Sequence, residues 1–123
     1  MKHWTRRTFT GAALAALLSP AIPAFAAETI KIGLITALSG QSARAGEALT
    51  RGLTIAIDEL NAAGGVLGRK FELVARDDEA NPAKGVTAAR ELVHKEKVTV
   101  LFGGLDTPVS IAIVPIMNEA KVP

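Results

Sequence analysis

The chain has 123 residues, no cysteine, and 14 basic against 12 acidic side chains, for a formal net charge of +2. A balance so close to neutral excludes the strongly basic surface on which nucleic-acid binding depends. Without cysteine there is no disulfide, no thiolate-bound zinc or iron–sulfur cluster and no cysteine nucleophile, and the length fits one domain at most.

The first 26 residues differ in composition from the rest. They contain three basic residues and no acidic one, and an apolar run over residues 11–18 is followed by two prolines and the pattern Ala24-Phe25-Ala26. This order is typical of a secretory signal peptide, cut between Ala26 and Ala27. A membrane anchor is the alternative, but spanning needs about 20 apolar residues and the prolines interrupt this stretch sooner.

Arg6 and Arg7 stand between Thr5 and Thr8-Phe9, a pattern that resembles the twin-arginine export motif. Adjacent arginines are also common in signals for the general route, so the route stays open. No cysteine stands at the cleavage site, which excludes a lipid anchor there. We expect residues 27–123, with 11 basic and 12 acidic side chains, to form a soluble periplasmic protein.

The mature part begins with a predicted strand and a long predicted helix. Residues 29–36 (TIKIGLIT) are short, β-branched and mostly apolar, which predicts a buried strand. Residues 43–63 predict a helix that ends at Gly64-Gly65, because glycine tolerates the left-handed position after a helix. The apolar spacings of three and four predict one buried face, made of Leu49, Leu53, Ala56, Ile57 and Leu60.

The next strand and helix carry a clearer start signal. A turn over residues 65–70 leads into a predicted strand at 71–76, and Asn81-Pro82 predicts a helix start, since Asn caps free amides and Pro loses no hydrogen bond there. That helix should run to about residue 97. The predicted buried residues are Val86, Ala89, Leu92 and Val93.

A third strand over residues 98–102 is followed by Gly103-Gly104 and a second cap-then-proline signal, Thr107-Pro108. The helix that starts there contains Pro115, which should bend it. Val122-Pro123 indicates the entry to a fourth strand, so we expect the chain to be an N-terminal fragment. The predicted buried residues of the last helix are Val109, Ala112, Ile113, Ile116 and Ala120.

Alternating strands and helices predict an α/β fold in three layers, a parallel sheet with helices on both faces. In such sheets ligands bind beyond the carboxyl ends of the strands, where neighbouring connections leave toward opposite faces. With a strand order of 2-1-3, that point lies between the first and third strands. The loops that meet there are residues 38–46 and 103–107.

These two loops offer hydroxyls and glycines rather than catalytic groups. Ser39 and Ser42 lie in the first and Thr107 in the second, beside the amides of a helix N-terminus, which attract anions such as a carboxylate. The alternative is that Thr107 only caps its helix. Asp106 would repel a carboxylate, yet it could pair with a ligand ammonium or cap the helix itself. Arg44 fits a solvated surface position.

Other chemistries lack support in the sequence. Glu47 follows Gly46 where a phosphate-binding loop needs lysine, and no G-x-G-x-x-G follows the first strand. Residues 77–79 (DDE) could suggest a metal, but three consecutive side chains converge poorly, so a solvated strand end is favoured. His94 is the only histidine of the mature part, which leaves Ser-His-acid catalysis without support.

At this point the sequence resembles the periplasmic solute-binding proteins of ABC transporters, in their leucine/isoleucine/valine-binding (type I) group. The resemblance covers residues 28–123 and rests on three ordered segments. They are IKIGLITALSG, the block DELNAAGGVLGRKFELVARDDEANPAKGVTAARELV, and VTVLFGGLDTPVSIAIVPIMNEAKVP. Each segment alone is ordinary, but the ordered set is specific.

The resemblance implies the first lobe of a two-lobed protein that closes on a small solute and delivers it to a membrane permease. It implies no enzyme activity, cofactor or metal, and the second lobe and hinge would lie outside residues 27–123. In this family a Ser or Thr with nearby amides after the third strand receives a ligand carboxylate. The implied ligand residues are Leu105, Asp106 and Thr107 on one side and Ser39 and the Ala45-Gly46 turn on the other.

Two departures bear on the ligand. Amino-acid binders of this group often have an aromatic residue where Ala45 stands and a small neutral one where Asp106 stands. An amino acid is the expected solute, with an amide, urea or an aromatic acid as alternatives. The same fold also serves as a ligand-sensing receptor domain, and an exported α/β enzyme is a third interpretation.

Overall fold

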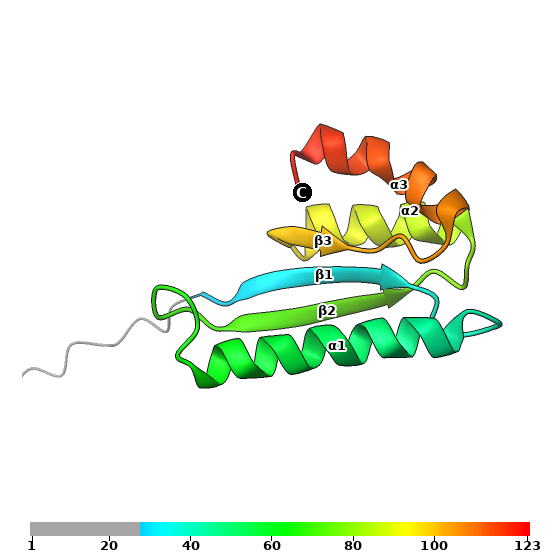
Figure 1. The fold of residues 1–123 in the computed structure, drawn as a ribbon. Coiled ribbons are helices and arrows are strands. Elements are labelled where there is room, and N and C mark those ends of the chain that lie inside the picture. The colour runs from blue at the N-terminus through cyan, green and yellow to red at the C-terminus, as the bar shows by residue number, and fades with distance from the viewer. Residues whose placement is uncertain (1–27) are drawn as a thin grey trace, which may run out of the picture.

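The computed structural model describes residues 28–123 as a sheet between two helical layers (Figure 1). The predicted signal peptide, with Arg6, Arg7 and the cut between Ala26 and Ala27, lies outside the described residues. Among the helices of residues 28–123, none is long and apolar enough to cross a membrane. The sheet between two helical layers confirms the three-layer α/β arrangement expected from the sequence.

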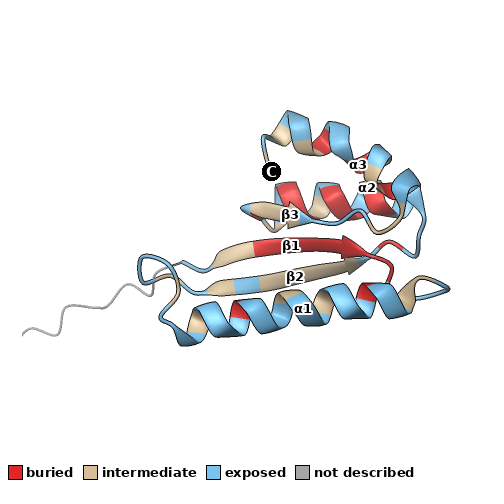
Figure 2. Cartoon of the chain, in the orientation of Figure 1, coloured by how far each residue is buried: buried red, intermediate tan, exposed pale blue. Residues whose placement is uncertain are grey.

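All three strands run parallel, and the first is the central one. The sheet has the order β2-β1-β3, with β1 at Ile30–Thr36, β2 at Phe71–Asp77 and β3 at Val100–Phe102. Ile30 pairs with Phe71, and Ile32 pairs with Val100. Figure 2 shows that the buried residues of the sheet are concentrated in β1. The observed order β2-β1-β3 confirms the predicted strand order of 2-1-3.

The helices divide between the two faces of the sheet. Helix α1 (Ala43–Ala62) covers one face, while α2 (Pro82–Arg90) and α3 (Thr107–Ala120) cover the other (Figure 1). A π-helical turn, η1 (Glu91–Lys95), continues α2 directly, so the helix predicted to reach about residue 97 ends close to that position.

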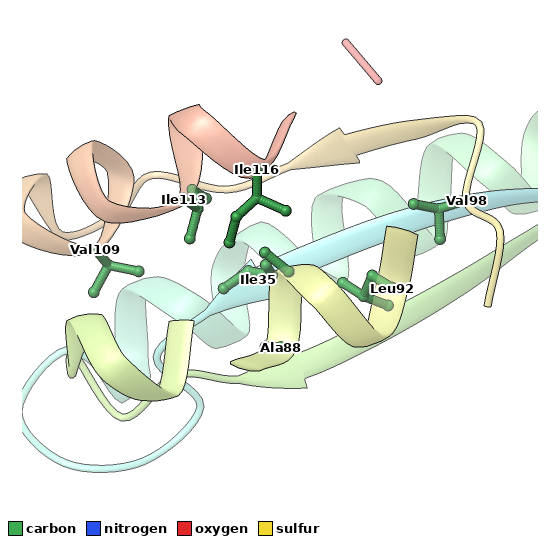
Figure 3. Close-up of a cluster of buried hydrophobic side chains, with 8 residues drawn as sticks. Ile35, Ala88, Leu92, Val98, Val109, Ile113 and Ile116 are labelled. Atoms are coloured by element: carbon green, nitrogen blue, oxygen red, sulfur yellow. The ribbon is translucent and has the colours of Figure 1, made fainter. Parts of the chain in front are cut away.

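The main hydrophobic core lies between β1 and the layer formed by α2 and α3. Ile35 of β1 is fully buried beneath Ala88, Leu92 and Ile113 (Figure 3). Burial of large side chains such as these removes apolar surface from water, and each Å² of apolar surface buried stabilises the fold by about 25 cal/mol. The cluster consists of Ile35, Ala88, Ala89, Leu92, Val98, Val109, Ile113 and Ile116.

Two predicted helix boundaries are formed as the sequence indicated. The Oδ1 atom of Asn81 accepts from the amides of Ala83 (2.9 Å) and Lys84 (3.2 Å), which caps α2. At the end of α1, Gly64 adopts φ +104°, and the amide of Gly65 donates to the carbonyl of Leu60 at 2.8 Å. Backbone donors and side-chain oxygens thus replace the helical bonds that are missing at these ends.

The predicted buried face of α1 is mostly wrong. Ile57 is buried and Leu53 half-buried, but Ala56 is exposed and Leu49 and Leu60 keep 42% and 47% of their surface. The cause is the place of α1 on the sheet, because this helix packs mainly on β2, an edge strand, and little on the central strand β1. Its apolar stripe therefore borders an uncovered part of the sheet.

The end of the chain follows the prediction only in part. Helix α3 continues through Pro115, and the bend expected at this proline stays a prediction. Beyond α3, the carbonyl of Pro123 accepts from the amide of Leu101 in β3 at 2.8 Å. The chain end thus lies beside the free edge of β3, where a fourth strand would lie, and that strand stays a prediction.

Close packing between α2 and α3 depends on Gly85. A Cβ atom at this position would lie 2.5 Å from Cγ1 of Val109. Gly85→Ala should therefore lower the free energy of unfolding by about 1–3 kcal/mol, as overpacking of a core does. Val109→Ala should cost about 2 kcal/mol by leaving a cavity. In denaturant unfolding, the double variant should lose less than the sum of the two losses, and additive losses would contradict this contact.

Candidate functional site

Three loops meet at the carboxyl edge of the sheet. Residues 37–42 connect β1 to α1, residues 78–81 connect β2 to α2, and residues 103–106 connect β3 to α3. Because α1 and α3 leave toward opposite faces, the chain diverges between the adjacent strands β1 and β3. This is the position at which open parallel sheets bind ligands.

A hydrogen bond joins the two loops on either side of this position. Ser42 Oγ donates to Asp106 Oδ1 at 3.3 Å, across 64 positions of sequence. Ser42 is the residue before α1, and its side chain makes no capping bond. The Ser42–Asp106 bond therefore fixes the start of α1 relative to the start of α3.

The predicted cap at Thr107 is wrong, because Asp106 occupies that position. Thr107 is the first residue of α3 and is exposed, while Asp106 has extended backbone angles (φ −104°, ψ 120°). The Asp106 side chain does not cap the helix either, since Oδ1 accepts from Ser42 instead. Oδ2 is shielded from solvent and has no hydrogen-bond partner within residues 28–123.

Asp77 joins the end of β2 to the first loop. Its Oδ1 accepts from the amides of Leu38 (2.9 Å) and Glu79 (2.8 Å). Burial opposes the charged form, but the two amides, together with the Ser39 hydroxyl and the charge of Lys84, hold the pKa of Asp77 below its ordinary value. Asp77 is thus an ionised acceptor that organises two loops at once.

The neighbouring Asp78 shows the opposite behaviour. Its side chain is buried, and Oδ1 accepts from the amide of Ala80 at 2.8 Å. Burial raises the pKa of Asp78, the Ala80 amide partly offsets this, and the charges of Asp106 and Asp77 raise it further. Asp78 therefore responds to a carboxyl group at the end of its own strand, β2, and to another on the loop after β3.

The residues predicted to bind a ligand fall into two groups. Ala45 and Leu105 line an apolar groove of about 630 Å³ between α1 and β3. Ser39 is exposed on the first loop, Thr107 is exposed at the start of α3, and the charge of Asp106 acts on the buried Asp78. The groove is lined by Leu34, Ala45, Ala48, Leu49, Gly52, Leu53, Phe102, Gly103 and Leu105.

Gly46 explains how the first turn of α1 reaches this edge. A Cβ atom on Gly46 would lie 1.9 Å from the carbonyl oxygen of Ala37, and 3.1 Å from Oγ1 of the fully buried Thr36. Only glycine allows so close an approach of helix to strand end. The position of Ala45 on the rim of the groove therefore depends on the residue that follows it.

Comparison with known proteins agrees with this geometry. A family model described as periplasmic binding protein matches residues 29–123. The chain belongs to the periplasmic binding protein family. Leu/Ile/Val-binding protein homolog 7 of Brucella suis is 39% identical over 110 residues, which are 89% of this chain and 27% of that protein.

Two solved structures of transporter binding proteins superimpose well on this chain. The branched-chain amino acid binding protein LivJ of Streptococcus pneumoniae, in complex with isoleucine, has a TM-score of 0.74 and 36% identity, covering 77% of this chain and 27% of LivJ. A solute-binding protein of R. palustris in complex with 4-hydroxybenzoate has a TM-score of 0.69 and 38% identity, covering 77% and 26%. The chain spans about a quarter of the length of these relatives.

Sequence reasoning on this periplasmic binding protein missed the roles of Asp77 and Asp78. The sequence favours a solvated strand end at residues 77–79, whereas Asp78 is buried. Within residues 28–123, no group of three or more His, Cys, Asp or Glu side chains is placed to hold a metal. The signal that could have identified Asp77 was its place at the end of β2, directly beside the end of β1.

Asp78→Asn provides a test of the buried carboxyl group. The variant keeps an oxygen to accept from Ala80 but cannot ionise. Since the pKa of Asp78 is raised on folding, its ionised form destabilises the fold above that pKa, and the cost vanishes below the unfolded value of about 3.9. Asp78→Asn should therefore raise the thermal unfolding temperature at pH 7, with the gain vanishing at about pH 3.

Asp77→Asn is the matched control with the opposite sign. Its pKa is lowered on folding, so the charged form stabilises the fold above the unfolded value and this is lost as pH falls through the folded one. The variant should unfold at a lower temperature than the wild type at pH 7. A lower unfolding temperature for Asp78→Asn at pH 7 would show that its charge is compensated.

Proposed function

We propose that the chain is part of the solute-binding component of an ABC importer, with branched-chain or other amino acids as the first candidate solutes. The family match and the Leu/Ile/Val-binding relatives support this. The observation that carries the proposal is the pair of loops joined by Ser42 and Asp106, at the strand ends where such a sheet binds ligands.

The proposed ligand contacts come from both loops. Ser39 and Thr107 offer exposed hydroxyls, and Ala45 and Leu105 form the apolar wall at one end of the groove. Asp106 supplies a carboxylate beside them. We propose binding without catalysis, cofactor or metal, and the partners are the solute and a membrane permease.

An aromatic acid is the second candidate solute. The R. palustris protein in complex with 4-hydroxybenzoate is 38% identical to this chain. Ala45 leaves room at the rim of the groove where a larger side chain would narrow it. Amides and urea belong in the same test, because they too are small polar solutes. A receptor domain would show an output or membrane segment in the complete gene.

The proposed location is the periplasm, reached by a cleaved signal peptide without a lipid anchor, so that the first lobe starts at residue 27. Mass spectrometry of the exported protein should give Ala27 as the first residue. Lys substitutions of Arg6 and Arg7 should block export only if the twin-arginine route is used. Export of an intact chain that still begins at Met1 would contradict the cleavage site.

Calorimetry on the full-length protein that carries this chain tests the function. A panel of amino acids, primary amides, urea and aromatic acids should contain at least one solute that binds with measurable heat. Thr107→Ala should weaken binding of that solute about 10- to 150-fold if a charged group meets the hydroxyl, which corresponds to about 1.5–3 kcal/mol.

Thr107→Ser is the matched control, because it keeps the hydroxyl and should bind within a few-fold of the wild type. Equal affinities of Thr107→Ala and the wild type would remove Thr107 from the site. A panel in which no member releases or absorbs heat would count against the proposed function as a whole.

A further inference from the structure

The start of α3 offers little to an anionic group. Pro108, at the second helical position, has no N–H, and the amides of Val109 and Ser110 both donate to the carbonyl of Asp106 at 3.1 Å. The Ser110 hydroxyl donates to the same carbonyl at 3.1 Å. An anion at a helix N-terminus is held by several free backbone N–H groups. Among the first three residues of α3, only Thr107 has a backbone N–H without a partner in residues 28–123.

The charge at this position also opposes an anion. Asp106 stands before α3 with one oxygen, Oδ1, accepting from the Ser42 hydroxyl at 3.3 Å. Its other oxygen, Oδ2, is shielded from solvent and accepts no hydrogen bond from residues 28–123. In the same part of the chain no lysine or arginine forms an ion pair with Asp106.

Neighbouring carboxyl groups strengthen the negative field. Asp78 is buried on the adjacent loop and senses the charge of Asp106 as well as that of Asp77. Lys84 is paired with Glu79 and acts on Asp77. Because charges interact more strongly where water is excluded, a ligand carboxylate at this edge would meet repulsion, whereas an ammonium or amide N–H would be attracted.

We propose that Asp106 makes this lobe hold the nitrogen end of its solute, an ammonium or a primary amide, rather than a carboxylate. This inference rests on the proposed function and names the chemical class of the solute. It reverses the orientation that the family resemblance implies, in which the loop after β3 receives a ligand carboxylate. Thr107 serves either orientation, since its hydroxyl can accept from an N–H donor.

Another role for Asp106 would be purely structural, through its bond to Ser42. Two variants separate the roles. Asp106→Asn keeps an oxygen that can accept from Ser42 but removes the charge, while Ser42→Ala removes the hydrogen bond and keeps the charge. A specificity role requires that only Asp106→Asn changes which ligands bind. A structural role requires that both variants weaken all ligands alike.

The experiment is calorimetry on the full-length protein with two pairs of probes that differ at one end. 4-Methylpentanamide and 4-hydroxybenzamide carry an N–H donor without a carboxylate, and 4-methylpentanoate and 4-hydroxybenzoate carry a carboxylate at the same position without nitrogen. For the wild type we expect binding of a nitrogen probe at least tenfold tighter than that of its carboxylate partner. In Asp106→Asn this preference should fall at least tenfold, while Ser42→Ala keeps it.

The outcomes separate this inference from the function on which it rests. A carboxylate probe that binds the wild type as tightly as its nitrogen partner overturns the inference and leaves solute binding intact. A panel in which nothing binds, including free amino acids, overturns the function itself. Should Asp106→Asn fail to fold in a thermal melt, the preference of the wild type between the paired probes decides alone.

Discussion

The arrangement of β1 between two parallel partners is the constraint on which the rest of this fold depends. Its backbone is paired along both edges, and its side chains are buried on both faces, with Leu34 and Ile35 at 1% and 0% exposure. A strand held on four sides cannot shift its register without exposing its core residues. The carboxyl end of β1 therefore gives the surrounding loops a fixed reference.

Each loop of the candidate site is attached to this reference by a polar bond. The amide of Asp78 donates to the carbonyl of Thr36, and Asp77 accepts from Leu38, which joins the ends of β1 and β2. Ser42 and Asp106 then join the β1 side to the β3 side. The exposed residues Ser39 and Thr107 thus lie on segments of limited freedom, and the binding proposed for them would cost less conformational entropy.

Local sequence signals predicted the elements well and their surroundings less well. Asn81-Pro82 and Gly64-Gly65 act through neighbouring amides, so their effect can be read without knowledge of the fold. The exposure of Leu49 could not be predicted in this way. Periodicity defines the apolar face of a helix, but not how much of that face a neighbouring element covers.

The cap of α3 shows the same limit at the site. Asp106 and Thr107 are both residue types that cap helices, and the choice between them depends on backbone angles set by the β3 end. The partner that takes Oδ1 of Asp106 lies 64 positions away, in Ser42. Residue types therefore narrowed the cap to two neighbouring residues, while the role of each depended on contacts that only the tertiary structure creates.

The central place of the first strand also has a consequence for how the chain folds. Residues of β1 pair with residues about 40 positions later in β2 and about 70 positions later in β3. Forming either pairing therefore closes a long loop of the chain, which costs conformational entropy. Contacts of such long range slow folding relative to local helix formation. During synthesis, the earliest strand to emerge stays unpaired until most of residues 30–102 have followed, so its apolar side chains lack their native neighbours throughout that interval.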